Sequence, residues 1–202
     1  MTEDARDRRW LWLALIFALG LGLRWSLVSV GPYHSDCLLL AVQSQKIILT
    51  GKMHYLQSSG LPLTALTGAL FVAIFNAAED LDRAVRAVNM MSVVFGSLSI
   101  WLVYWCAARM RDNATALLAA LFCAINPFLI GMATFGNSHV LALFFLLASL
   151  CFLQLYADSG RRLDLIWAGC ALGATGASRV QDLVAMAIPM TFLMVWQRHR
   201  QS

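Results

Sequence analysis

Charged residues are scarce in this chain: they make up only 13 % of its 202 positions, whereas hydrophobic residues make up 60 %. A water-soluble domain of this size would not bury that much apolar surface, so the composition indicates an integral membrane protein whose excess apolar surface contacts the lipid bilayer. The formal net charge is +4, yet the arginines stand in small clusters between apolar stretches. Because they form no continuous basic face, we expect no nucleic acid partner.

Paired cysteines and a cleavable leader are also missing. The five cysteines show no CxxC spacing and four of them stand inside apolar stretches, so the sequence predicts neither a disulfide framework nor a metal site. The first apolar stretch, Trp10–Val30, is too long for the core of a signal peptide and has no small-residue cleavage motif behind it. We therefore expect it to be a retained membrane anchor.

Seven hydrophobic runs follow one another along the chain. They are Trp10–Val30, Leu61–Ala78, Ala84–Ala108, Ala114–Gly131, Val140–Ala157, Leu165–Ser178 and Leu183–Trp196. A bilayer core of about 30 Å needs roughly 20 helical residues, so the first and third runs are long enough to span it and the last two are short. The pattern predicts an all-α, polytopic membrane helix bundle that forms a single transmembrane domain over residues 1–202.

The distribution of Lys and Arg favours six spanning helices over seven. If all seven runs span, six basic residues flank the cytoplasmic side and eight the other side, although flanking positive charge normally stays in the cytoplasm. If Leu61–Ala78 lies at the outer surface instead, nine are inside and five outside, the five being Lys46, Lys52, Arg83, Arg86 and Arg179. We therefore expect six spans, cytoplasmic N- and C-termini and an external loop over residues 31–83 with interfacial helices. A seven-span bundle is the alternative.

Two short helices are expected inside that external loop. Ser35 or Asp36 can cap a helix whose apolar residues flank a polar patch at residues 43–46, and Gly51 is a natural stop for it. Pro62 suits the first turn of the second helix. Both helices are predicted to lie on the membrane surface.

The most suggestive polar cluster is Tyr33-His34-Ser35-Asp36, directly after the first spanning run. A carboxylate beside an imidazole, just above the hydrocarbon layer, can act as a general base on a hydroxyl group or hold a metal ion. The alternative is that Asp36 only caps the helix that follows, and the two roles are compatible.

Other ionisable residues are predicted on the same side of the membrane. They are Arg24 near the outer end of the first helix, Arg83 and Arg86 at the start of the second spanning helix, His139 before the run Val140–Ala157, and Arg179 with Asp182 between the two short final runs. Ionisable groups at membrane depth are rare and commonly mark a functional cavity. The alternative is an Arg179–Asp182 pair that only stabilises its turn.

A spaced series of motifs runs through nearly the whole chain. It comprises His34-Ser35-Asp36 after an anchor, Gly51, Leu61-Pro62-Leu63, Arg83/Arg86-x-x-Asn89, Arg109-x-Arg111-Asp112, Asn126-Pro127 and the turn Ser178-Arg179-Val180-Gln181-Asp182. In this order the motifs resemble the N-terminal module of the GT-C glycosyltransferases. The pattern is most similar to the protein O-mannosyltransferase and aminoarabinose-transferase branches of that group.

The resemblance implies transfer of a sugar from a polyprenyl-phosphate carrier to an unknown acceptor at the extracytoplasmic or lumenal face, with inversion at the anomeric carbon. It further implies that Asp36, beside His34, is the catalytic base. Arg179, with Arg83 and Arg86 behind it, would neutralise the departing phosphate. No cofactor is expected, and nothing in the pattern supports a divalent metal.

The chain also departs from the family pattern. Many relatives have a second acid after the first-loop aspartate, where this chain has Cys37, and an acid in the second external loop, where it has Asn137 and His139. Relatives are usually longer, so the resemblance implies that these residues are the N-terminal part of a longer architecture or a partner subunit. The alternative to an enzyme is a non-catalytic lipid-binding, transport or scaffold subunit built on the same module.

Overall fold

The computed structural model describes residues 3–53, 62–182 and 184, and the regular secondary structure of these residues is α-helix. The helices are α1 (Glu3–Ser26), α2 (Ser35–Thr50), α3 (Pro62–Ile74), α4 (Leu81–Met110), α5 (Asn113–Ile125), α6 (Pro127–Ala133), α7 (Ser138–Ser159) and α8 (Arg162–Ser178). The predicted all-α fold is confirmed. The last hydrophobic run, Leu183–Trp196, lies outside the described residues apart from Val184.

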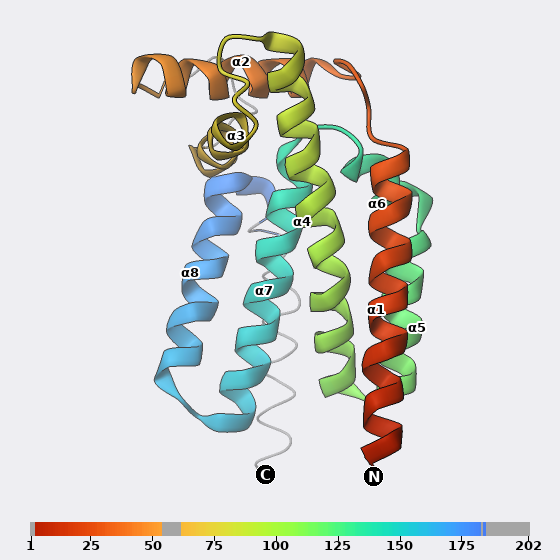
Figure 1. The fold of residues 1–202 in the computed structure, drawn as a ribbon. Coiled ribbons are helices and arrows are strands. Elements are labelled where there is room, and N and C mark those ends of the chain that lie inside the picture. Colours follow the sequence, from red (N-terminus) through yellow and green to blue (C-terminus); the bar gives the residue numbers. More distant parts are fainter. Residues whose placement is uncertain (1–2, 54–61, 183, 185–202) are drawn as a thin grey trace.

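Five helices lie side by side as a bundle, and α2 and α3 lie across one end of it (Figure 1). α1, α5 and α8 run in one direction, whereas α4 and α7 run in the opposite direction. The C-termini of α1, α5 and α8 and the N-termini of α4 and α7 therefore lie on the side of the bundle that α2 and α3 cover. We call this side the capped end. The connections before α2, α4 and α7 and the residues after α8 all gather there, and these segments carry most of the predicted site residues.

The surface of the bundle is that of a membrane protein. α4 and α7 are long and apolar enough to cross a membrane, and the pair α5 and α6 makes a third span if its two parts are counted together. Large apolar side chains such as Trp12, Phe122 and Ile166 are exposed. In a chain with so little charge this surface suits lipid tails rather than water. The protein is thus an integral membrane protein, and the count of six spans remains a prediction.

The run Ala114–Gly131 is not the straight helix that its hydrophobicity predicts, because α5 ends at Ile125 and α6 continues at a bend of 56°. Pro127 lacks an N–H and disfavours helical backbone in the residue before it, and Asn126 accordingly has φ −62° and ψ 119°. The Asn126 side chain accepts a hydrogen bond from the Leu129 N–H at 3.1 Å and so begins the new helix. The break leaves the last carbonyls of α5 without donors from their own helix.

α2 ends and α3 begins where the sequence predicts. Gly51 follows α2 with φ 65° and donates its N–H to the Ile47 carbonyl at 2.9 Å, while Pro62 is the first residue of α3. The polar residues of α2 face the protein, since Ser44 is buried and donates to the Ala65 carbonyl of α3 at 3.5 Å. Leucine and isoleucine side chains are exposed on the other face of α2, as expected of an interfacial helix.

A core of small and medium-sized apolar residues joins α2 and α3 to the bundle. It consists of Cys37, Leu40, Ala41, Val72, Ala77, Ala84, Val85, Ala87, Val88 and Met91. α3 comes closest to α2 at Gly68, where a Cβ would collide with the side chain of Ser44. This close packing fixes the position of the first turn of α2 above the bundle.

Candidate functional site

Asp36 is the second residue of α2, and it does not cap that helix. The cap is His34, whose Nδ1 accepts a hydrogen bond from the Asp36 N–H at 3.2 Å, so the prediction of Ser35 or Asp36 as the cap is wrong. Nδ1 accepts this bond and so turns its lone pair toward the helix, and the Asp36 carboxylate lies 3.6 Å from the same nitrogen. No described residue donates a hydrogen bond to that carboxylate, whose side chain is 39 % exposed. Asp36 is thus available to accept a proton.

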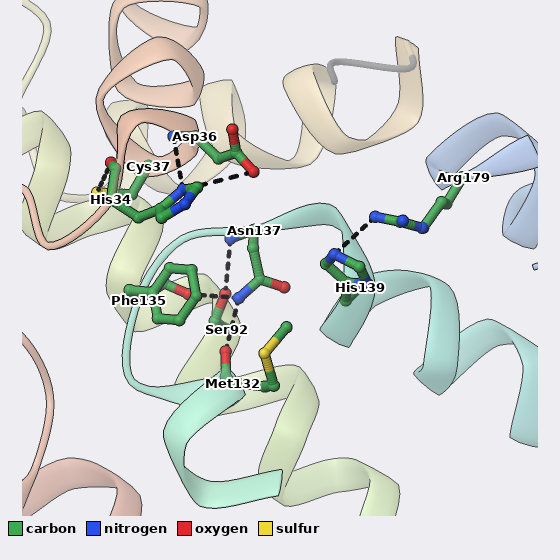
Figure 2. Close-up of polar contacts among 9 residues, drawn as sticks. All are labelled: His34, Asp36, Cys37, Ser92, Met132, Phe135, Asn137, His139 and Arg179. Carbon is green, nitrogen blue, oxygen red and sulfur yellow. Dashed lines mark hydrogen bonds and ion pairs between the residues drawn. The ribbon is translucent and has the colours of Figure 1, made fainter. Parts of the chain in front are cut away.

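His139 and Arg179 make a direct contact between α7 and the residue that follows α8, as Figure 2 shows. Arg179 Nη1 lies 2.6 Å from His139 Nε2. A guanidinium can only donate, so Nε2 accepts and the neutral ring carries its proton on Nδ1. Arg179 Nε lies 3.5 Å from Asp182 Oδ1 in an ion pair whose geometry gives no hydrogen bond. Arg179 is partly exposed and therefore open to a ligand.

A small depression lies between Asp36 and the start of α7. It has a volume of about 10 Å³ and is lined by Asp36, Thr64 and Ser138 among others, which is room for about one water molecule. Thr64 Oγ1 donates to the Ser178 carbonyl at 3.4 Å and so ties α3 to the end of α8, directly before Arg179. The depression therefore sits where α2, α3, α7 and the end of α8 meet.

His139 contacts Arg179, whose Nε lies 3.5 Å from Asp182 Oδ1, and Ser138 directly before His139 lines the small depression together with Asp36. In Figure 2, Asp36 lies over the loop that carries Asn137 and His139, and Arg179 points toward His139 from the side. The structure thus brings together residues that are widely separated in the sequence. We call Asp36, His139, Arg179 and Asp182 the polar cluster.

Asn89 of α4 holds the loops that precede α2 and α7, the helices that carry Asp36 and His139. Its Nδ2 donates to the Ser29 carbonyl before α2 at 2.9 Å, and its Oδ1 accepts from the Gly136 N–H before α7 at 2.7 Å. The side chain is fully buried, and a Cβ at Gly136 would lie only 3.1 Å from the Val88 backbone. The sequence shows Asn89 only as a polar residue in an apolar run, and it gives no sign of these partners 60 and 47 residues away.

Asn137 has a structural role and does not replace the acid that relatives carry in this loop. Its Nδ2 donates to the carbonyls of Met132 and Phe135 at 2.6 and 2.9 Å, and its Oδ1 accepts from the Val140 N–H at 3.2 Å. These bonds cap α7 and close the loop before it. His139 is therefore the residue of this connection that joins the polar cluster.

A cavity of about 270 Å³ extends from the polar cluster into the bundle. His139 and Asp182 line it together with Arg24, while apolar side chains such as Leu129 and Leu143 form most of its wall. The cavity is thus polar at its ends and apolar between them, which suits a molecule that is part lipid and part polar.

Arg24 is buried and holds the end of α5. Its Nη1 donates to the carbonyls of Gly20 and Ala124 at 2.9 and 3.1 Å, and its Nη2 donates to the Cys123 carbonyl at 3.1 Å. The last two carbonyls belong to α5 at its break, where the negative end of the helix dipole favours a cation. The Nε of Arg24 has no hydrogen-bond partner among the described residues. We therefore assign Arg24 a structural role at the edge of the cavity.

Arg83 and Arg86 do not join the polar cluster. They line a groove of about 490 Å³ between α1 and α4 that shares no lining residue with the cavity beneath the cluster. Arg83 Nε lies 3.2 Å from Asp80 Oδ2, and Arg86 Nε donates to the Val30 carbonyl at 3.3 Å. Of the three arginines predicted to bind the donor phosphate, the structure places only Arg179 near Asp36.

The polar cluster combines groups that are able to accept a proton and to bind a phosphate. Within the described residues, no three His, Cys, Asp or Glu side chains lie close enough to hold a metal ion together. The cluster offers a carboxylate without a hydrogen-bond donor, a neutral imidazole and a guanidinium. A carboxylate can accept a proton, and a guanidinium binds phosphate oxygens through paired N–H groups.

Comparisons with known proteins agree on one kind of relative. The family described as dolichyl-phosphate-mannose-protein mannosyltransferase matches residues 59–202, a stretch that begins after α2 and so does not include Asp36. An undecaprenyl phosphate-alpha-4-amino-4-deoxy-L-arabinose arabinosyl transferase from Erwinia tasmaniensis is 30 % identical over 118 residues, which cover 55 % of this chain and 21 % of that relative. The chain therefore spans about a fifth of the length of this curated relative.

Proposed function

Because the chain belongs to the dolichyl-phosphate-mannose-protein mannosyltransferase family, we propose that it takes part in transferring a sugar from a polyprenyl phosphate to an acceptor. This membership confirms the resemblance to GT-C glycosyltransferases that the motifs predict. The arabinosyl transferase relative is named for a sugar on undecaprenyl phosphate, which supports this class of donor. The observation that carries the proposal is the polar cluster, where the start of α7 contacts Arg179 through His139 and lines one depression with Asp36 through Ser138.

We propose Asp36 as the catalytic base. In this reaction the acceptor oxygen attacks the anomeric carbon, the bond from that carbon to the phosphate oxygen breaks, and Asp36 takes the acceptor's proton. The carboxylate suits the role because no described residue donates to it and the neighbouring His34 Nδ1 accepts a hydrogen bond from the Asp36 N–H. A base in this position contributes roughly 10²–10⁴-fold to the rate.

We propose Arg179 as the ligand of the donor phosphate. His139 holds one end of the guanidinium through Nη1, so the plane of the group is fixed before a ligand arrives. Nη2 makes no hydrogen bond to a described residue and can donate to a phosphate oxygen, whereas Nε is buried and lies 3.5 Å from Asp182 Oδ1. Negative charge on the phosphate grows as the bond to the sugar breaks, and a guanidinium held in place stabilises that change. The apolar wall of the cavity below suits the first part of the polyprenyl chain.

We propose that the capped end faces the extracytoplasmic or lumenal side, with the N- and C-termini in the cytoplasm. The reason is the distribution of flanking basic residues, nine against five. This count assumes that the two groups of basic residues lie on opposite sides of the membrane. The directions of the bundle helices support the assumption, because they put the described residues of the two groups at opposite ends of the bundle.

Sugar transfer by the purified chain in nanodiscs tests the proposal. With a mixture of radiolabelled polyprenyl-phosphate sugars, Asp36→Asn should transfer at least about 10²-fold less than wild type, because the amide cannot accept the proton. Asp112→Asn makes the same chemical change at an exposed position near the opposite end of the bundle and should transfer as wild type does.

A second measurement separates the alternatives. If wild type binds the donor lipid without transferring sugar, the chain is better described as a non-catalytic lipid-binding, transport or scaffold subunit. If it neither binds nor transfers, the proposed function is wrong.

A further inference from the structure

The groove of about 490 Å³ at the capped end is not used by the proposed reaction. Its walls are apolar and include Trp25, Phe75 and Met90, of which Trp25 is 60 % and Phe75 49 % exposed. Its charged lining residues are Arg83 and Arg86. An open apolar groove with two guanidinium groups suits one kind of molecule in a bilayer, a lipid that carries a phosphate.

The two arginines keep donors available to a ligand. Arg83 is 70 % exposed, and its partner Asp80 also accepts the N–H groups of Asp82 and Arg83 as the cap of α4. Arg86 donates through Nε to the Val30 carbonyl and makes no ion pair with a described residue. Two guanidinium groups therefore face the groove, and the one carboxylate that pairs with either of them, Asp80, is already engaged in a cap.

The side chains along α4 change from apolar to basic to acidic toward the capped end. Met90 lies deepest, and Arg86 and Arg83 follow about one and two turns nearer the end. Asp82, which is not one of the lining residues, precedes Arg83 in the helix, about 12 Å from Met90 along the axis. Glu79 lies just before the helix. Glu79 and Asp82 are exposed and form no ion pair with a described residue. This order of apolar, basic and acidic side chains is complementary to a lipid whose hydrocarbon chain is followed by a phosphate and then by an ammonium group.

We propose that this groove binds a phospholipid with an amine head group. Its phosphate lies on Arg83 and Arg86, its ammonium lies at Glu79 and Asp82, and one chain lies against the aromatic wall. An anionic lipid without an amine would bring its charge next to unpaired carboxylates. A choline head keeps the positive charge but has no N–H to donate to them. The inference goes beyond sugar transfer and does not depend on it.

Fluorescence of Trp25 tests the proposal, because brominated lipid chains quench a tryptophan that they touch. The chain is placed in phosphatidylcholine nanodiscs with an equal minor fraction of brominated phosphatidylethanolamine, phosphatidylglycerol or phosphatidylcholine. The difference between wild type and Trp25→Phe isolates the signal of Trp25. We expect phosphatidylethanolamine to quench it most, and quenching that is equal for the three lipids, or greatest for phosphatidylglycerol, overturns the proposal.

Two double variants locate the head-group contacts. Arg83→Gln with Arg86→Gln should weaken phosphatidylethanolamine binding roughly 20-fold, as expected for two charges at a membrane surface. Glu79→Gln with Asp82→Asn should remove the preference over phosphatidylglycerol. Arg111→Gln, an exposed arginine near the opposite end of the bundle, is the matched control and should change neither. Unchanged quenching in both double variants would show that the lipid binds elsewhere. The comparison of the three lipids uses the wild-type residues of the head-group site, so it does not depend on how the double variants fold.

Discussion

Replacing Asn89 by leucine should loosen the capped end without substituting any residue of the polar cluster. The change keeps a side chain of similar size but removes the partners of the Ser29 carbonyl and the Gly136 N–H, which lie 2.9 and 2.7 Å from the amide. A buried polar group without a partner costs about 1–3 kcal/mol, whereas side-chain hydrogen bonds between membrane helices average about 0.6 kcal/mol. For two groups we expect a loss of about 3 kcal/mol, roughly a hundredfold in the equilibrium for opening.

Cys37 reports this opening because it is fully buried at the start of α2. In a chain whose other cysteines are alanine, the rate at which a maleimide labels Cys37 follows the fraction of molecules that are open. We expect labelling to be roughly a hundredfold faster in Asn89→Leu. Ser99→Ala removes a hydroxyl whose hydrogen bond stays within α4 and should leave the rate unchanged. A rise below about threefold, which corresponds to one average membrane hydrogen bond, would refute the reasoning.

Replacing Arg24 by methionine should lower the free energy of unfolding by about 2–4 kcal/mol, because the carbonyls at the break in α5 lose a charged donor. Denaturant unfolding in mild detergent measures this, and a loss below about 0.5 kcal/mol would contradict the assigned role. Hydrogen bonds from the Thr115 N–H and hydroxyl hold the pKa of the exposed Asp112 carboxyl below its ordinary 3.8. The stability that this helix cap contributes is therefore present above pH 3.8 and is lost as the pH falls through the lowered pKa. Melting temperatures of wild type and Asp112→Asn should therefore converge as the pH is lowered below 3.8, and a gap independent of pH would count against this linkage.

Most helices of the fold follow from local properties of the sequence. Length and continuity of the hydrophobic runs predict α4, α7 and α8, and Gly51 and Pro62 mark helix ends because their backbone preferences act within one or two residues. Pro127 stands inside an apolar run, and the rule that a proline disfavours helix in the preceding residue accounts for the break there. One local feature was misread. His34 was overlooked as a cap because serine and aspartate, which cap more often, follow it directly.

The site was harder to predict because it depends on contacts between distant segments. The family resemblance names Asp36 and Arg179, but which arginines lie near Asp36 is decided by the face of α4 on which Arg83 and Arg86 stand. The backbone partners of Asn89 and the two α5 carbonyls that Arg24 binds lie 47 to 100 residues away. No periodicity or spacing encodes which remote carbonyl or N–H a buried side chain will meet.

The hydrogen bonds of Arg24 have a consequence for the order in which the chain assembles. Arg24 is synthesised with α1, yet two of its three acceptors belong to α5, 99 and 100 residues later. Until α5 exists, its guanidinium has only the Gly20 carbonyl of its own helix, and from the last turn of α1 it reaches water at the membrane surface. We therefore expect α1 to settle into its final position only when α5 arrives. Cysteine accessibility at the end of α1, in chains stopped before and after α5, should show α1 sinking inward as its partner is made.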